Sequence, residues 1–178
     1  LQIGGMQLLH MEHDDPYEKT LPKINQFVFE IFIIYLFLTF VCAILYFISG
    51  MSIFDAVAHA MTTISTGGFS THNTSLAYFN SFNIESVSIL FMIVGSLPFV
   101  IYLKMTHGDW KSLINDDQIK LFFLILLFLV LITTYWLKQN YDENILYSLR
   151  ITAFNITSIL TGTGYTISNY GTWGGFGL

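Results

Sequence analysis

The chain has 178 residues, of which 53% are hydrophobic, 17% aromatic and only 11% charged. Soluble domains carry about 25% charged residues, so this composition predicts a membrane protein rather than a soluble fold. Seven Lys and Arg against twelve Asp and Glu leave a net charge of −5 and no basic cluster for nucleic acid, which we exclude as a partner. The single cysteine, Cys42, excludes a disulfide or a cysteine-based metal site within the chain.

The first part of the chain predicts a loop followed by a membrane-spanning helix. Residues 12–23 are polar and contain two prolines, which is typical of a loop. No residue from Ile31 to Phe54 is charged, and a helix that crosses a bilayer needs about 20 apolar residues. Ser49-Gly50 marks the expected end of this helix.

A short helix and a glycine-bearing hairpin follow. Ser52 with Asp55 three residues later resembles a capping box, so we expect a helix from this point to about Ile64. This helix is too short to cross a bilayer and leads directly into a polar segment. We call that segment the first hairpin: Ser65-Thr66-Gly67-Gly68-Phe69-Ser70-Thr71.

The middle of the chain predicts a second spanning helix between polar segments. Residues 71–83 are rich in Asn, Ser and Thr, whereas residues 86–103 contain no charge. Pro98 predicts a kink in this helix, which neighbouring helices can accommodate within a bundle. Residues 104–120 predict a polar loop.

The last part of the chain repeats the order of the first. Residues 121–137 form another charge-free span, and Asp142, Glu143 and Asn144 open a second short helix that should run to about Leu160. It leads into the second hairpin: Thr161-Gly162-Thr163-Gly164-Tyr165-Thr166-Ile167.

The two hairpins are copies of each other. A shift of 96 residues places the first hairpin on the second, with Gly68 on Gly164. The same shift places Phe69 on Tyr165. Long helix, short helix and hairpin recur with this period, which indicates an internal repeat. The predicted fold is therefore an all-α membrane protein with repeated helix–pore-loop–helix units.

The distribution of lysines predicts the orientation in the membrane. Five of the seven basic residues lie in the two polar segments that precede long helices: Lys19, Lys23, Lys104, Lys111 and Lys120. The positive-inside rule places these segments in the cytoplasm. Both hairpins should then enter from the outer face.

The hairpins have the chemistry of a cation filter. Non-helical backbone is tolerated at membrane depth only where it is buried in protein or lines a wet cavity. Gly68 and Gly164 permit backbone angles that a side chain disfavours. Their neighbouring carbonyls are hard oxygen ligands suited to an alkali cation, and four hydroxyls could add to them: Thr66, Ser70, Thr161 and Thr163. Neither hairpin contains an acidic residue, which argues against a carboxylate-ring calcium filter.

These segments resemble the Trk/Ktr/HKT superfamily of potassium transporters, most closely its bacterial TrkH members. Residues 66–72 are similar to the second filter of that family, and residues 54–60 to the pore helix before it. Residues 161–166 are similar to the third filter, where Phe is common at the position of Tyr165. Residues 4–8 resemble the end of the first repeat.

The resemblance implies four helix–pore-loop–helix units in one polypeptide, arranged with pseudo-fourfold symmetry around a potassium pathway. It divides this chain into four parts: the end of a first repeat with a cytoplasmic loop (1–23), a second unit (24–104), a cytoplasmic loop (105–118) and a third unit truncated after its filter (119–178). Below, residues 24–104 are called the N-terminal unit and residues 119–178 the C-terminal unit. Because the chain starts without Met and stops within a glycine-rich stretch, we expect a fragment of a longer protein.

The resemblance also implies potassium uptake by a multi-pass protein in the lipid of the bacterial cytoplasmic (inner) membrane. The filter residues that it implies are Thr66, Gly67, Gly68, Phe69, Thr161, Gly162, Thr163, Gly164 and Tyr165. Potassium would be bound at Thr66, Gly67, Gly68, Gly162, Thr163 and Gly164. The family implies no cofactor besides the transported ion, a cytosolic nucleotide-binding regulatory subunit of the TrkA type, and a homodimer.

Several charged side chains outside the hairpins are open to more than one interpretation. Arg150 at membrane depth could act in conduction, but snorkelling to the interface or pairing with Glu143 is an equal alternative. Glu85 lies at the end of a long helix and is expected to reach the lipid headgroups. His59 shares a helix face with Asp55, and a packing role in the pore helix is favoured over a metal site or a proton relay.

Three other functions compete with potassium uptake. A pore of the same superfamily could prefer sodium or be non-selective. An intramembrane enzyme would need a nucleophile and a base, but the chain has no Gly-x-Ser-x-Gly, no His-Glu-x-x-His and no paired intramembrane aspartates. A scaffold that only packs helices would not need two filters. We therefore expect a pore-forming transport subunit and not an enzyme.

Overall fold

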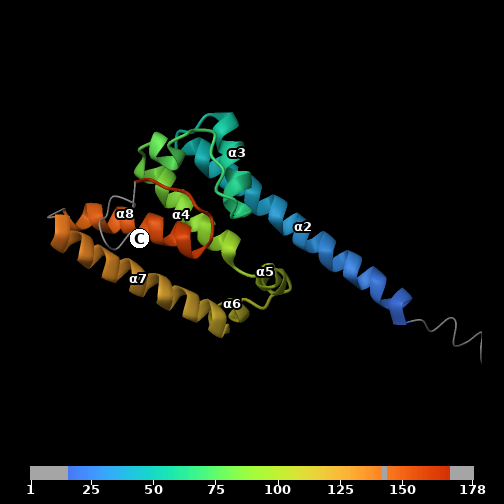
Figure 1. Cartoon of the computed structure of the whole chain (residues 1–178). Coiled ribbons are helices and arrows are strands. Elements are labelled where there is room, and N and C mark those ends of the chain that lie inside the picture. The colour runs from blue at the N-terminus through green and yellow to red at the C-terminus, as the bar shows by residue number, and fades with distance from the viewer. Residues whose placement is uncertain (1–15, 142–143, 169–178) are drawn as a thin grey trace, which may run out of the picture.

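The computed structural model describes residues 16–141 and 144–168, and every regular element within them is a helix (Figure 1). This confirms the predicted all-α class. The elements in chain order are α2 (Pro16–Ile48), α3 (Ile53–Ile64), the 3-10 helix η1 (Ser75–Tyr78), α4 (Phe82–Ser96), α5 (Phe99–Thr106), α6 (Lys111–Asn115), α7 (Asp117–Tyr141) and α8 (Ile145–Leu160).

Two helices are long and apolar enough to cross a membrane: Asn25–Ile48 within α2 and Asp117–Asn140 within α7. Their surfaces carry large apolar side chains with no cover from the rest of the described chain. Phe40 of α2 and Leu124 of α7, for example, are each 65% exposed. Exposure of such apolar side chains is favourable in lipid and unfavourable in water, which supports the prediction that these helices lie in a membrane.

The third predicted span is broken rather than kinked at Pro98. Helix α4 ends at Ser96, and α5 leaves it at an angle of 88°. Leu97 is extended because the proline ring disfavours a helical conformation for the residue before it. The hydroxyl of Tyr102 donates to the backbone carbonyl of Val94 at 2.6 Å, which holds α5 against the end of α4.

Both polar segments predicted to be loops are largely helical. Helix α2 begins at Pro16 instead of after residue 23, because proline is tolerated at the first helical position, where an N–H has no helical partner. Within residues 104–120, α5 continues to Thr106 and α6 occupies Lys111–Asn115. The Asp116 carboxylate then accepts the backbone N–H groups of two residues in the first turn of α7.

One buried tyrosine connects three helices of the N-terminal unit by hydrogen bonds and packing. Tyr46 of α2 is fully buried, and its hydroxyl lies 2.9 Å from the Thr63 hydroxyl of α3. The same hydroxyl donates to the Ser88 hydroxyl of α4 at 3.0 Å. Helix α4 also passes close to the end of α3, since a Cβ placed on Gly95 would lie 2.8 Å from the carbonyl oxygen of Ile64. Three helices therefore meet around the first hairpin.

The C-terminal unit packs onto this core through α8. The hydroxyl groups of Thr134 in α7 and Thr152 in α8 are 2.6 Å apart, which joins the two helices of this unit. On another side, α8 packs against α4, and its buried Phe154 enters the apolar core of the N-terminal unit. The two short helices thus lie in one assembly with their hairpins close together (Figure 1).

We predict that Tyr46→Phe lowers the free energy of unfolding by about 1 kcal/mol, because it removes one hydroxyl from a three-helix contact in an apolar interior. The effect stays modest because the Thr63 and Ser88 hydroxyls keep their bonds to backbone carbonyls. Denaturant unfolding of the full-length protein in detergent measures it. Tyr135→Phe, at a side chain that is 65% exposed, should leave stability unchanged; equal stability of both variants and wild type would contradict the role of Tyr46.

Candidate functional site

The two hairpins have similar backbone conformations at matched positions. Helices α3 and α8 end at Ile64 and Leu160, the same 96-residue shift that aligns the sequences. Positive φ angles then recur at matched positions, +50° at Thr66 against +74° at Gly162, and +65° at Gly68 against +87° at Gly164. The positive φ at both predicted glycines is confirmed, whereas the strained angle of Thr66 was not foreseen, because threonine rarely adopts it.

Hydrogen bonds that end the two short helices also repeat. The amide of Gly68 donates to the Thr62 carbonyl at 3.4 Å, and the amide of Gly164 donates to the Ser158 carbonyl at 3.3 Å. Each hairpin therefore leaves the C-terminal end of a short helix with the same geometry. The negative end of each helix dipole therefore faces the hairpin.

The hairpins touch at Gly68. A Cβ placed on this residue would overlap the backbone carbonyl oxygen of Thr163 in the second hairpin. No atom of the described chain outside its own neighbours lies within 4 Å of a Cβ placed on Gly164. Gly68 is thus required for the close approach of two backbones, and Gly164 only for its backbone angle.

The aromatic residues that follow the glycines have different surroundings. Tyr165 is 1% exposed and projects into α3, where its hydroxyl lies 2.5 Å from the Thr62 hydroxyl. It also donates to the carbonyl of His59 at 3.2 Å. Phe69, at the matched position, is 78% exposed. Tyr165 therefore joins the second hairpin to α3 in the N-terminal unit, a contact that the sequence did not indicate.

The end of the first hairpin is attached to α3 by a chain of hydrogen bonds. His59 is buried, and its Nδ1 donates to the Asp55 carbonyl at 2.8 Å. Its Nε2 lies 3.0 Å from the Ser70 hydroxyl, which in turn accepts the backbone N–H of His72 at 3.1 Å. This confirms the packing role of His59. No group of three or more His, Cys, Asp or Glu that could hold a metal occurs in the described segments.

Asp55 makes a second attachment to the same hairpin. Its Oδ1 accepts the hydroxyl of Thr71 at 2.6 Å, and its Oδ2 accepts the hydroxyl of Ser52 at 2.8 Å. The Ser52 hydroxyl accepts the amide of Asp55, which confirms the predicted helix start. The hydrogen bonds from Thr71 and Ser52 hold the pKa of Asp55 below its ordinary value.

The start of α8 is capped in another way. The Asn144 side chain accepts the backbone N–H of Leu146 at 3.1 Å, so Asn144 is the N-cap. The predicted contributions of Asp142 and Glu143 lie outside the described residues, as does the predicted repeat end at residues 4–8.

The structure changes two expectations for charged side chains. Arg150 of α8 does not snorkel away from the protein, because both its Nε and Nη2 bind the carboxylate of Glu85 in α4. The alternative of pairing with Glu143 lies outside the described residues. Glu85 is 5% exposed and does not reach toward lipid headgroups. The partners are 65 residues apart in sequence, so only the packing of α4 on α8 brings them together.

Some of the hydroxyls considered as ion ligands are bound within the protein. The Thr161 hydroxyl donates to the Thr157 carbonyl at 2.8 Å and lies 2.8 Å from the Thr163 hydroxyl. The Ser70 hydroxyl contacts His59. Backbone carbonyls therefore remain the main candidates for contact with an ion.

The chain matches the family model described as "TrkH: Cation transport protein" over residues 1–176. The Trk system potassium uptake protein TrkI of Halomonas elongata is 36% identical over 98% of this chain and 35% of its own length. The Trk system potassium uptake protein TrkH of Salmonella typhimurium is 32% identical over 97% of this chain and 37% of its own length. The crystal structure of the potassium transporter TrkH from Vibrio parahaemolyticus aligns with a TM-score of 0.83 and 29% identity, over 88% of this chain and 34% of that chain.

Apolar long helices, short helices and repeated hairpins define an all-α membrane protein built from helix–pore-loop–helix units. The family model covers nearly the whole chain, and the chain therefore belongs to the TrkH family of cation transport proteins. It spans about a third of the length of the relatives that it matches.

We predict that Gly68→Ala destabilises the full-length protein more than Gly164→Ala does. Both alanines must adopt a left-handed conformation, which costs about 1–2 kcal/mol. At Gly68 the new Cβ would also overlap the Thr163 carbonyl, and such overpacking adds about 1–3 kcal/mol. Thermal unfolding in detergent compares the two; equal losses would show that the hairpins do not meet at Gly68.

We predict that the contribution of Asp55 to stability depends on pH. Since folding lowers the pKa of Asp55, its ionised form stabilises the fold above its ordinary pKa, and this stabilisation is lost as the pH falls through the lowered pKa. Asp55→Asn should be less stable than wild type near neutral pH, with a difference that shrinks below about pH 4. Unfolding at several pH values measures this. A difference that does not change with pH would contradict it, and Asp117→Asn at an exposed ion pair serves as the control.

Proposed function

We propose that the protein to which this chain belongs takes up potassium across the bacterial cytoplasmic membrane, as a multi-pass pore-forming subunit. One observation carries the proposal: two hairpins with similar backbone conformations meet at Gly68 and Thr163, each at the C-terminal end of a short helix. Backbone of this kind at membrane depth is stable only when it is buried in protein or lines a wet cavity.

Potassium would be bound by backbone oxygens of the hairpins, which replace part of its water shell. The proposed filter residues are Thr66, Gly67, Gly68, Phe69, Thr161, Gly162, Thr163, Gly164 and Tyr165. Neither hairpin contains a carboxylate, so the carbonyl oxygens carry only partial negative charges. Such ligands favour a weakly hydrated monovalent cation, and they bind it weakly enough for it to leave again. The C-terminal ends of α3 and α8 add negative potential at the same place. The process involves no covalent chemistry and no cofactor besides the ion.

Two hairpins do not enclose an ion path, and the chain spans about a third of its relatives. We propose that the complete protein has four helix–pore-loop–helix units with pseudo-fourfold symmetry, two of which are the N-terminal unit (24–104) and the C-terminal unit (119–178). A cytosolic nucleotide-binding subunit of the TrkA type and a second copy of the protein are the proposed partners. The relatives TrkI of Halomonas elongata and TrkH of Salmonella typhimurium are both named potassium uptake proteins, which supports potassium as the ion.

A sodium-conducting or non-selective pore of the same family is the alternative. The choice of ion in the superfamily depends partly on its first filter, which is not among the two hairpins described here. The two functions differ in the ratio of rubidium to sodium uptake, since rubidium replaces potassium in a potassium filter.

We predict that cells without their own potassium uptake gain selective rubidium uptake when they express the full-length protein. Gly68→Ser should abolish this uptake or its preference over sodium, because the side chain would displace the Thr163 carbonyl. Gly164→Ser should weaken the preference less, since only its backbone angle is strained. Uptake of both ions, normalised to protein in the membrane, is the measurement.

Gly108→Ser is the matched control, because Gly108 also has a positive φ of +91° but lies between α5 and α6, away from both hairpins. It should retain selective uptake. Selective uptake by the Gly68 variant would show that the first hairpin is not the filter. Wild-type uptake that favours sodium, or that takes both ions equally, would support the sodium-conducting or non-selective pore instead of potassium uptake.

A further inference from the structure

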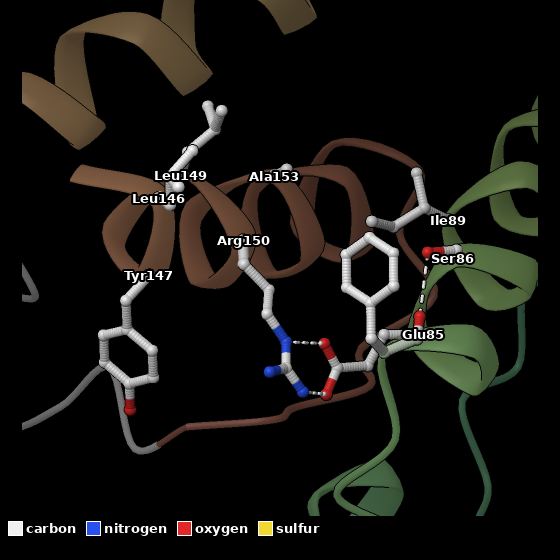
Figure 2. Close-up of a pocket in the computed structure, with 9 residues that line it drawn as sticks. Glu85, Ser86, Ile89, Leu146, Tyr147, Leu149, Arg150 and Ala153 are labelled. Carbon is white, nitrogen blue, oxygen red and sulfur yellow. Dashed lines mark hydrogen bonds and ion pairs between the residues drawn. The ribbon is translucent and has the colours of Figure 1, made fainter. Parts of the chain in front are cut away.

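The contact between Glu85 and Arg150 joins the two units at the opposite end of α8 from Tyr165. It lies apart from the contacts of the second hairpin and from the apolar packing of Phe154. Arg150 Nε donates to Glu85 Oε2 at 2.6 Å, and Arg150 Nη2 donates to Glu85 Oε1 at 2.7 Å (Figure 2). Such a fork fixes both the distance and the relative rotation of the two groups, which a single hydrogen bond does not. Within the part of the chain that the structure describes, it is the one ion pair between the two units.

The surroundings of the pair are apolar. The Glu85 side chain is 6% exposed and the Arg150 side chain 31%. The guanidinium carbon of Arg150 lies 5.9 Å from the centre of the Phe82 ring, a favourable cation–π distance. Beside the pair is an open pocket of about 680 Å³ that is lined mainly by apolar side chains, among them Ile89, Leu149 and Ala153 (Figure 2). Either charge alone would therefore face apolar groups without a partner, which is costly at membrane depth.

The pair has no counterpart in the other repeat unit. The position that matches Arg150 in α3 is Phe54, which is 73% exposed. The first hairpin has a backbone similar to that of the second although α3 has no cation at the matched position, so folding of a short helix and its hairpin does not itself require Arg150. Among the two short helices that the structure describes, only α8 carries such a charge, which indicates a function specific to the second hairpin.

Helix α8 connects this pair to the filter. Arg150 lies in the first half of α8, and the second hairpin starts directly after Leu160. Tyr165 then holds the hairpin against α3. Because a helix is rigid over this length, polar contacts before and after its C-terminal end, together with the packing of α8 on α4, fix how far α8 projects toward the ion path and how it is rotated.

We propose that Glu85 and Arg150 are positioning residues: their fork holds α8, and through it the second hairpin, at the depth at which its carbonyls bind a cation. This rests on the proposed function of the hairpins as a filter. Glu85 belongs to the N-terminal unit and Arg150 to the C-terminal unit. The pair therefore fixes the position of the second hairpin relative to the first. Neither side chain contacts the ion.

The test uses the full-length protein in cells without their own potassium uptake, with rubidium and sodium uptake measured per amount of protein in the membrane. Glu85→Gln and Arg150→Gln each break the fork and should lower the rubidium-to-sodium preference on the order of tenfold. The exchanged pair E85R/R150E can form the fork in reverse and should restore most of the preference. E85L/R150L removes both charges and keeps an apolar contact; its preference should remain low.

Each alternative outcome is decisive. Full preference in E85L/R150L would show that only charge cancellation matters, and would overturn positioning. Unchanged preference in both single variants would overturn it as well, as would failure of the exchanged pair to recover. If the single variants do not reach the membrane, E85R/R150E decides alone: near wild-type preference supports the proposal and altered preference overturns it.

A control pair and the wild type separate this proposal from the one on which it rests. Lys120 and Asp117 form an exposed ion pair within α7, 3.0 Å apart, and K120Q/D117N should leave the preference unchanged because exposed pairs contribute little. A wild type without selective rubidium uptake would defeat the proposed potassium function itself. A selective wild type with unaffected Glu85 and Arg150 variants would defeat only the positioning role.

Discussion

The buried contact of Tyr165 with α3 is the interaction on which the relative position of the two hairpins depends. Its hydroxyl reaches the Thr62 hydroxyl and the His59 carbonyl, groups that lie beside the first hairpin on the same turn of helix. Moving a hydroxyl from water into this apolar interior without a hydrogen-bond partner would cost several kcal/mol. The Tyr165 hydroxyl is therefore favoured beside Thr62 and His59. When it binds there, the second hairpin lies against Gly68.

Close packing follows from this contact and from small residues. Gly68 allows the Thr163 carbonyl to approach, and Gly95 allows α4 to approach the end of α3. In lipid, helices gain little from the hydrophobic effect between them, and close contact between small residues with hydrogen bonds between hydroxyls holds them together. The bonds of Tyr46 with Thr63 and Ser88, and of Thr134 with Thr152, are of this kind.

The two repeat units share a backbone but differ in their side chains. Phe69 and Phe54 are exposed in the N-terminal unit, whereas the matched Tyr165 is buried and the matched Arg150 is paired. The difference follows from the neighbour of each unit in the described chain: α3 and α4 cover the second hairpin and α8, while the outer side of α3 has no neighbour there. The internal repeat thus accounts for the shared backbone conformation of the two short helices and hairpins. The contacts between the units account for the different surroundings of their side chains.

The sequence by itself determined the local features. Charge-free stretches indicated the long helices, Ser52 and Asp55 the start of α3, and glycine at matched positions the two hairpins, because helix capping, bilayer length and positive φ depend on residues close together in the chain. The sequence wrongly predicted loops at residues 16–23 and 104–120, because a polar segment can still form a helix. It also predicted a kink at Pro98, where the helix breaks and the chain turns by 88°. The contact of Tyr165 with Thr62 and the fork between Arg150 and Glu85 were decided by the tertiary structure alone. These partners are 103 and 65 residues apart, and only the packing of α8 on α4 and α3 selects them from the many polar groups that could have paired.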